Sequence, residues 1–129
     1  MFVDTSALYG ALDDTDPHHT ELSQSLRELQ GEPLLTHNYV VVESVALVRR
    51  RFGAQATRLL LLELLAPAEI VWIDATIHHT ATSAFLASSA RRPSLVDFAS
   101  FEVMRLHGIR TALAVDRDFV DAGFDVLPA

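Results

Sequence analysis

The chain opens with Phe2-Val3-Asp4-Thr5-Ser6-Ala7-Leu8, where two apolar residues lead straight into an aspartate and then into a helical pattern. Phe2 and Val3 predict a short strand, and Ser6, a good N-cap residue, predicts that a helix begins near it. An aspartate between a strand and a helix is most often a turn or cap residue. In a parallel sheet, however, the carboxyl end of a strand is also where ligand sites form.

Strand-like and helix-like stretches alternate along the rest of the chain. The expected strands cover residues 2–3, 33–36, 70–73, 111–115 and 125–127, and the expected helices cover residues 6 onward, 16–31, 38–53, 54–65, 75–88 and 94–108. We expect strand 70–73 to be buried and strand 125–127 to lie at an edge. This alternation predicts an α/β fold in three layers, with a central parallel sheet of four to five strands between helices on both faces.

The composition excludes several classes of site. The chain has 129 residues, half of them hydrophobic, so we expect one domain over residues 1–129 with a core of its own. It has no cysteine, which excludes thiolate zinc sites and cysteine nucleophiles. All ten basic residues are arginine, and the missing lysine excludes P-loop and Schiff-base chemistry and disfavours a receiver-like phospho-acceptor domain. Without a bilayer-spanning apolar stretch or a secretory signal, a cytoplasmic protein with no membrane partner is expected.

Two aspartates follow predicted strands. Asp4 comes after strand 2–3, and Asp116 comes after the apolar strand 111–115, with Asp118 two residues further on. The carboxyl ends of parallel strands are where such sheets place their sites, so both aspartates are candidate site residues.

Two further acids lie among apolar residues in predicted helices. Glu43 has apolar neighbours on every side within residues 39–48, so we expect a nearly fully buried helix and a carboxylate that needs a metal, hydrogen-bond donors or an arginine as its partner. Asp97 follows Ser94 by three residues, the spacing of a capping box, while neighbours such as Phe98 predict partial burial. A buried ion pair is the structural alternative for Glu43, and a helix cap is the alternative for Asp97.

These four acids suit hard cations. Carboxylate ligands without thiolates or a suitably spaced histidine pair favour magnesium or manganese over zinc. Crowded carboxylates repel one another, and bound cations relieve that repulsion. Such a cluster can hold two metals about 4 Å apart, one activating water and the other stabilising the leaving oxygen of a phosphodiester.

With these residues in this order, the chain resembles the PIN-domain nucleases, and among them the VapC toxins of type II toxin–antitoxin systems. The resemblance rests on four acidic motifs and a C-terminal dipeptide that together span the chain. They are residues 2–8, Val42-Glu43-Ser44, residues 94–101, residues 108–119 and Gly123-Phe124. The resemblance implies a PIN-like nuclease domain over residues 1–129.

The resemblance also implies roles for individual residues. The residues that it assigns to metal binding and catalysis are Asp4, Glu43, Asp97 and Asp116. It implies that Asp118 is a further metal-binding acid whose position varies in the family. Ser6 is expected to orient the attacking water from behind the metal ligands, a role compatible with capping the first helix.

The activity implied by the resemblance is that of an endoribonuclease toxin that needs Mg²⁺ or Mn²⁺ and inhibits translation. Cleavage is expected to leave a 5′-phosphate and a 3′-hydroxyl. The implied partners are the RNA substrate, a cognate antitoxin protein whose tail covers the acidic groove, and a second copy of the chain in a homodimer.

Arginines and histidines give weaker signals. Arg91 and Arg92 precede the helix with Asp97, and Arg117 lies between two acids, so these three arginines are candidate RNA contacts, with solvated loop charges as the alternative. The histidine pairs at 18–19 and 78–79 point about 100° apart on a helix, so they are expected at the surface rather than on one metal.

The net charge of −7 argues against nucleic-acid binding at first sight. Two divalent cations at the site would reduce it to −3, so much of the acidity belongs to the site itself. Two alternatives stay open: another metal-dependent nuclease or phosphoesterase, acting on DNA or small phosphates, and a non-catalytic PIN-like interaction module. The presence of all four acids disfavours the second.

Overall fold

A five-stranded, all-parallel sheet forms the centre of the molecule, which we describe from a computed structural model covering residues 1–128. The strands are β1 (Phe2–Val3), β2 (Leu34–His37), β3 (Ala68–Val71), β4 (Thr111–Leu113) and β5 (Asp125–Leu127). Their order across the sheet is β3-β2-β1-β4-β5. This arrangement confirms the predicted parallel α/β fold, and β5 lies at an edge as expected.

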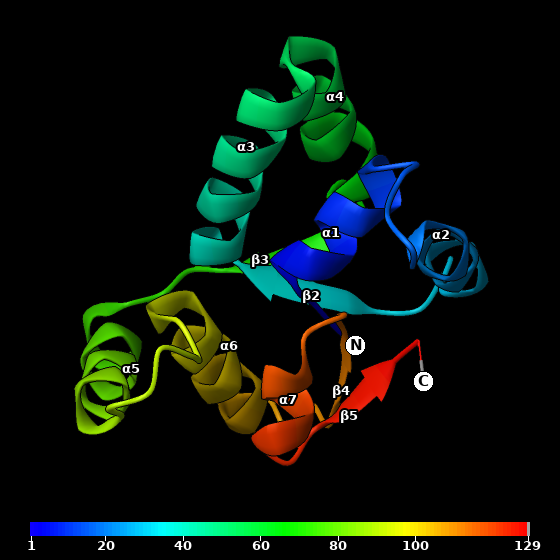
Figure 1. Cartoon of the computed structure of the whole chain (residues 1–129). Helices are drawn as coiled ribbons and strands as arrows, with labels where there is room; N and C mark the ends of the chain where they lie inside the picture. Colours follow the sequence, from blue (N-terminus) through cyan, green and yellow to red (C-terminus); the bar gives the residue numbers. More distant parts are fainter. Residues whose placement is uncertain (129) are drawn as a thin grey trace.

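Helices cover both faces of the sheet (Figure 1). They are α1 (Thr5–Leu12), α2 (His19–Glu28), α3 (Asn38–Phe52), α4 (Ala54–Leu59), the π-helical segment η1 (Leu60–Leu64), α5 (Ala75–Ala87), α6 (Leu95–Leu106) and α7 (Arg117–Asp121). The helices α1 to α4 gather on one side of the sheet, and α5, α6 and α7 gather on the other. No helix within residues 1–128 is both long enough and apolar enough to cross a membrane.

The order in which strands are added to the sheet reverses at β1. The chain first builds outward from β1 to β2 and β3, and then returns to place β4 on the other side of β1. The carboxyl ends of β1 and β4 are therefore neighbours, and the backbone N–H of Asp4 donates to the carbonyl of Leu113 at 3.0 Å. A reversal of this kind opens a crevice beyond the strand ends, where open α/β sheets bind their ligands.

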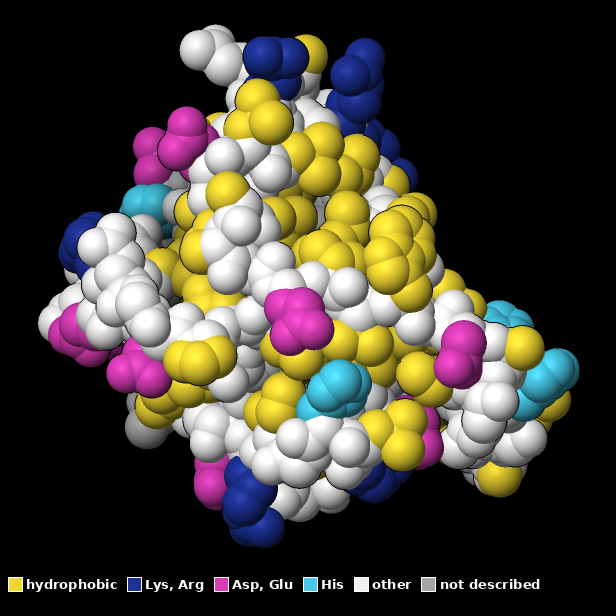
Figure 2. Space-filling view, turned by 180° about the vertical axis from the view of Figure 1, so that it is seen from behind, with side chains coloured by type: hydrophobic (Ala, Val, Ile, Leu, Met, Phe, Trp, Pro, Cys, Tyr) yellow, Lys and Arg dark blue, Asp and Glu magenta, His cyan; other side chains and the backbone are white. Residues whose placement is uncertain are grey.

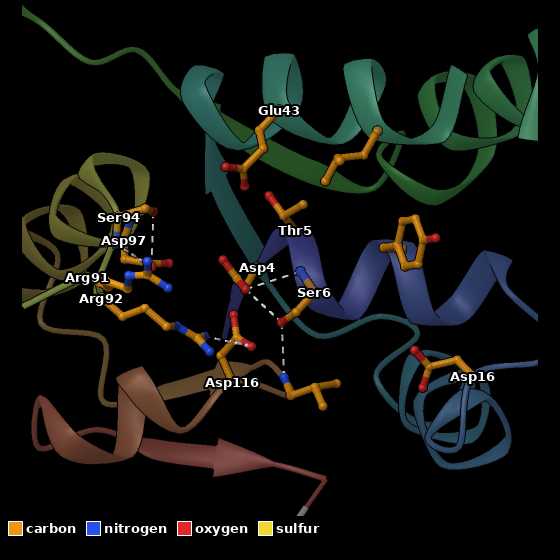
Figure 3. A pocket seen from close by; sticks show the side chains of 13 residues that line it. Asp4, Thr5, Ser6, Asp16, Glu43, Arg91, Arg92, Ser94, Asp97 and Asp116 are labelled. Atoms are coloured by element: carbon orange, nitrogen blue, oxygen red, sulfur yellow. Dashed lines mark hydrogen bonds and ion pairs between the residues drawn. The ribbon is translucent and has the colours of Figure 1, made fainter. Parts of the chain in front are cut away.

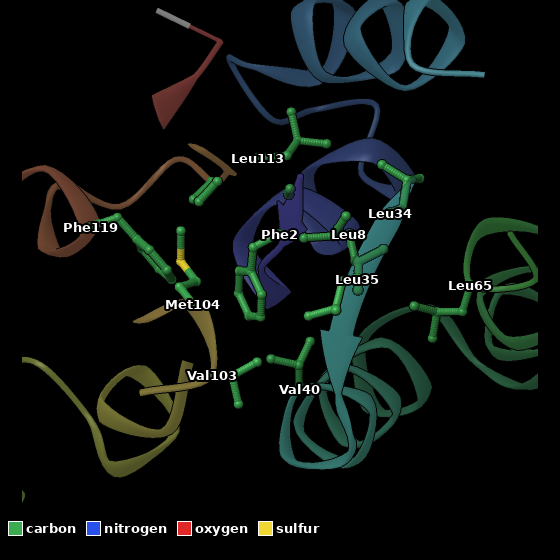
Figure 4. Packing of buried hydrophobic residues seen from close by; sticks show 14 of the residues in the cluster. Phe2, Leu8, Leu34, Leu35, Val40, Leu65, Val103, Met104, Leu113 and Phe119 are labelled. Carbon is green, nitrogen blue, oxygen red and sulfur yellow. The ribbon is translucent and has the colours of Figure 1, made fainter. Parts of the chain in front are cut away.

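The core holds these two strands rigidly. Phe2 is fully buried, with its ring centroid 5.7 Å from that of His37 and 6.0 Å from that of Phe119 (Figure 4). Leu8 and Leu113, both inaccessible to solvent, belong to the same cluster. Burial of each such side chain contributes about 1.5–3 kcal/mol, so the end of β1 has little freedom to move.

Three sequence expectations were wrong in detail. The strand expected to be buried at 70–73 is β3, an edge strand that begins at Ala68 and is only partly covered, and Trp72 beside it is 73% exposed. The helix expected over 54–65 divides into α4 and η1. The helix expected to begin near Asp16 begins at His19, because the Asp16 carboxylate instead accepts the backbone N–H of His18 at 2.7 Å in the preceding turn.

A buried polar link joins the two helical layers, and no local sequence pattern predicts it. His37 ends β2, is inaccessible to solvent, and its Nδ1 accepts the backbone N–H of Val40 at the start of α3. Its Nε2 lies 2.8 Å from Oγ of Ser100 in α6, and that hydroxyl donates to the carbonyl of Val96. This pattern assigns the proton of a neutral imidazole to Nε2. Burial lowers the pKa of His37 to about 4, which keeps the ring neutral.

We expect Ser100→Ala to destabilise the protein by about 1–3 kcal/mol, because it leaves the Nε2–H of His37 buried without an acceptor. Urea unfolding measures the change. Ser83→Ala, which removes an exposed hydroxyl from α5, is the control and should stay within about 0.5 kcal/mol of the parent. Equal unfolding midpoints for the two variants would show that the hydrogen bond between His37 and Ser100 does not stabilise the protein.

Candidate active site

Asp4 lies between β1 and α1, at the carboxyl edge of the sheet. Its side chain is only 2% exposed and caps α1 by accepting the backbone N–H of Ser6 at 3.1 Å. The helix cap suggested by the sequence is thus present, but it is Asp4 rather than Ser6 that provides it. One carboxylate oxygen is engaged in this way, and the side chain faces the pocket drawn in Figure 3.

Ser6 fixes the orientation of Asp4. Its Oγ donates to Oδ2 of Asp4 at 2.7 Å and accepts the backbone N–H of Val115 at 3.0 Å. The hydroxyl therefore connects the segment after β1 with the segment after β4, as the dashed lines in Figure 3 show. Ser6 therefore holds the carboxylate of Asp4 in a fixed orientation.

Asp97 enters the same site from α6. It forms the predicted capping box with Ser94: Oδ2 of Asp97 accepts the backbone N–H of Ser94 at 2.9 Å, and the backbone N–H of Asp97 donates to Oγ of Ser94 at 3.2 Å. Asp97 is 9% exposed and also lines the cavity. The cap and the site role are therefore compatible, since the cap engages Oδ2 and fixes the direction of the carboxyl group.

Asp116 completes a group of three. It precedes α7, and its carboxylate makes no capping hydrogen bond to that helix. One carboxylate oxygen from each of Asp4, Asp97 and Asp116 lies within 4.8 Å of the others. The structure thus brings together three of the four acids in the predicted core set.

Glu43 lies across the cavity from these three. It projects from α3 towards Asp4 and Thr5 (Figure 3) and lines the cavity, as does Leu47 one turn later. The expectation that this helix is buried all round was wrong: Glu43 is partly exposed and Val42 is 68% exposed, because only the face with Val40, Ser44 and Val48 packs inward. No arginine in the described part of the chain forms an ion pair with Glu43, so the alternative of a buried arginine partner has no support.

The cavity between these residues has a volume of about 510 Å³. Asp16 also lines it, from the turn before α2, and the sequence had suggested only a cap role for this residue. Nothing in the local sequence distinguishes Asp16 from an ordinary turn aspartate, because its place at the cavity depends on how α2 packs against α1.

Arg92 forms ion pairs at the edge of the group of acids. Its Nη2 lies 3.2 Å from Oδ1 of Asp116 and 2.9 Å from Oδ2 of Asp118. Asp118 is therefore paired with an arginine and lies outside the group of three acids. Arg91 lines the cavity and is exposed, whereas Arg117 is exposed and lines a different hollow, beside β5.

The histidines take no part in the group. His18, His19 and His78 are partly exposed and His79 is exposed, so neither adjacent pair is buried. His78 accepts or donates a hydrogen bond at 2.6 Å with the hydroxyl of Tyr39.

Electrostatics at the site favour a bound cation. Burial, with a smaller contribution from the charges of Asp97 and Asp116, raises the pKa of Asp4 to about 7 despite the hydrogen bonds from Ser6, which lower it. Burial is also the main cause that raises the pKa of Asp97. The ionised forms of both carboxylates are therefore disfavoured in the metal-free protein. A bound divalent cation would favour them, because its charge attracts the carboxylates. An all-oxygen donor set of this kind fits Mg²⁺ or Mn²⁺.

The chain is similar to PIN-domain proteins along most of its length. A PIN-domain model matches residues 1–125. The chain is 31% identical over 125 residues to the "23S rRNA-specific endonuclease VapC20" of Mycobacterium tuberculosis, covering 96% of this chain and 95% of that protein. It is 30% identical over 118 residues to "Ribonuclease VapC26" of the same species, covering 91% and 87% of the two chains.

Two solved structures have a similar fold. The crystal structure of M. tuberculosis VapC20, titled a sarcin–ricin loop cleaving toxin, superposes with a TM-score of 0.82 at 31% identity, covering 95% of both chains. FitAcB from Neisseria gonorrhoeae gives a TM-score of 0.70 at 17% identity, covering 97% of this chain and 94% of the other. The second of these likenesses concerns the fold alone.

The raised pKa of Asp4 predicts how stability changes with pH. In the metal-free protein the folded state keeps the Asp4 proton up to about pH 7, whereas the unfolded chain releases it near pH 3.8. The folded state therefore binds more protons between these values, so its Asp4-dependent stability is present at low pH and is lost as pH rises through 7.

Asp4→Asn cannot titrate and is the comparison. We expect the stability of the parent relative to Asp4→Asn to fall by about 1.4 kcal/mol for each pH unit between 4 and 7, and to level off above 7. Subtracting the variant's curve removes the opposite contribution of His37. Urea unfolding in EDTA at a series of pH values gives the measurement, and a pH-independent difference would contradict the assignment.

Proposed function

This chain belongs to the PIN-domain family, and we propose that it is a Mg²⁺- or Mn²⁺-dependent endoribonuclease that serves as the toxin of a toxin–antitoxin pair. One observation carries the proposal: three carboxylates from separate parts of the chain place oxygen atoms within 4.8 Å of one another at the wall of an open cavity. The VapC relatives, matched along nearly their whole length, support ribonuclease chemistry at this site.

In the proposed reaction, the acids have distinct tasks. Asp4, Asp97 and Asp116 hold the cations, and Glu43 faces the same space from α3 as a further ligand or as a base for the attacking water. Bound cations would supply positive charge at the scissile phosphodiester and would lower the pKa of a water molecule that they bind. Ser6 keeps Asp4 in its ligating orientation, and the capping box does so for Asp97.

Substrate binding needs positive charge in a protein whose net charge is −7. Arg91 and Arg92 lie at the cavity and are exposed, which supports a role for them in contacting RNA phosphates. Arg117 lies outside this cavity, so it is the weaker of the three candidates.

The proposed protein partners are a cognate antitoxin and a second copy of the chain. Toxin–antitoxin complexes such as VapBC2 from Rickettsia felis share the fold, with a TM-score of 0.71 at 12% identity over 97% of this chain and 95% of that one. Exposed apolar side chains lie on α3, α4 and η1, and Figure 2 shows an apolar area over this part of the molecule. They are Val42, Leu59, Leu61 and Leu62. Such a patch is typical of a protein interface and supports a homodimer.

Purified protein should cleave total cellular RNA in Mg²⁺ or Mn²⁺, leave 5′-phosphate ends, and lose all activity in EDTA. Large-subunit ribosomal RNA is the first defined substrate to try, because the VapC20 relative is named for it. Asp116→Asn should lower the rate about 100-fold or more, while Asp125→Asn, an exposed acid on β5, should leave it unchanged. Full activity in EDTA would rule out the metal-dependent mechanism, and cleavage of DNA alone would favour a different nuclease.

Glu43→Gln separates a site role from a structural one. The side chain is partly exposed and forms no ion pair with an arginine within residues 1–128, so the free energy of unfolding of the variant should lie within about 1 kcal/mol of that of the parent. It should nevertheless be stabilised less by Mg²⁺ in thermal melts and should cleave RNA poorly. Glu69→Gln, an exposed change on β3, is the matched control. A variant with parental Mg²⁺ stabilisation and parental activity would remove Glu43 from the site.

A further inference from the structure

Arg92 reaches into the group of acids from the loop between α5 and α6. Its Nε and Nη2 both donate to Oδ2 of Asp118, at 3.2 and 2.9 Å, while Nη2 also lies 3.2 Å from Oδ1 of Asp116. The guanidinium is thus anchored on Asp118 and extends one nitrogen towards Asp116. Asp118 lies outside the group of three acids, whereas Asp116 belongs to it.

The polar contacts of the Arg92 side chain within residues 1–128 are those with Asp116 and Asp118. The Arg92 side chain is 62% exposed, whereas the side chains of Asp116 and Asp118 are 37% and 13% exposed. Exposed ion pairs of this kind are weak, because water and salt compete with them. Its contact with Asp116 can therefore be broken without disturbing the core.

A cation bound by Asp4, Asp97 and Asp116 would need the carboxylate that Arg92 contacts. A guanidinium and a divalent cation at one carboxylate repel each other, and the repulsion is least screened where the neighbouring carboxylates are buried. Only the contact with Asp116 conflicts with the cation, because Asp118 can keep its own bond to Arg92.

We propose that Arg92 is an internal counter-ion of Asp116 that competes with the divalent cation for this carboxylate and so weakens cation binding. The inference rests on the proposed function, in which the three acids bind the cation. Arg92 acts here as a positioning residue: it holds Asp116 in place in the metal-free protein, and cation binding frees its Nη2 end at the mouth of the cavity. There it can meet a phosphate of the substrate.

Arg91 provides a matched control for this proposal. It belongs to the same loop, lines the same cavity and carries the same charge, but it forms no ion pair within the described part of the chain. Arg91→Gln therefore reports the general effect of removing one positive charge near the acids. Arg92→Lys retains the charge of Arg92 but not its forked geometry.

Calorimetric titration of Mn²⁺ into the purified full chain tests the proposal at one pH and ionic strength. We expect Arg92→Gln to bind Mn²⁺ about two- to fivefold more tightly than Arg91→Gln, the range that an exposed pair can supply. Arg92→Lys should lie close to the parent. Circular dichroism spectra should be unchanged, because the side chain is exposed.

Each outcome of the titration is informative. Equal Mn²⁺ affinity in Arg92→Gln and Arg91→Gln, or weaker binding in Arg92→Gln, would overturn the competition while leaving the proposed metal site intact. A parent protein that does not bind Mn²⁺ at all would overturn the proposed function, and the competition with it.

Discussion

The close approach of three carboxylates, two of them buried, is the constraint on which the rest of the site depends. Asp4, Asp97 and Asp116 hold oxygen atoms within 4.8 Å of one another, and burial together with this crowding keeps the pKa of Asp4 near 7. An arrangement that costs free energy in the metal-free state persists only if the surrounding structure enforces it. Each acid is in fact fixed separately, Asp4 by Ser6 and Asp97 by its capping box, while Arg92 neutralises part of the charge on Asp116.

The fold explains why these three acids can meet. The return of the chain from β3 to β4 puts the ends of β1 and β4 side by side, and the hydroxyl of Ser6 joins the two segments that follow them. The bond from His37 to Ser100 then ties α6, which carries Asp97, to the end of β2. The site therefore depends on long-range contacts in the core as much as on the acids, and loss of a buried link such as that to Ser100 is expected to loosen it.

Much of this could be predicted from the sequence, since it follows from local patterns. Strand-to-helix transitions marked Asp4 and Asp116, and the three-residue spacing from Ser94 marked the cap at Asp97. The burial of Glu43 was overestimated, because apolar neighbours in sequence do not reveal which face of α3 meets solvent, and Val42 proves to be exposed. The pairing of Arg92 with Asp116 and Asp118 was also not foreseeable, because it joins a loop to residues more than twenty positions away.

The central claim is that the three carboxylates are held together to bind a divalent cation. Diffraction from crystals grown with Mn²⁺, collected where manganese scatters anomalously, tests it most directly. The account predicts an anomalous peak at coordinating distance from Asp4, Asp97 and Asp116 together, with the Arg92 guanidinium moved away from Asp116. A cavity without such a peak at saturating Mn²⁺, with Arg92 still against Asp116, would contradict it.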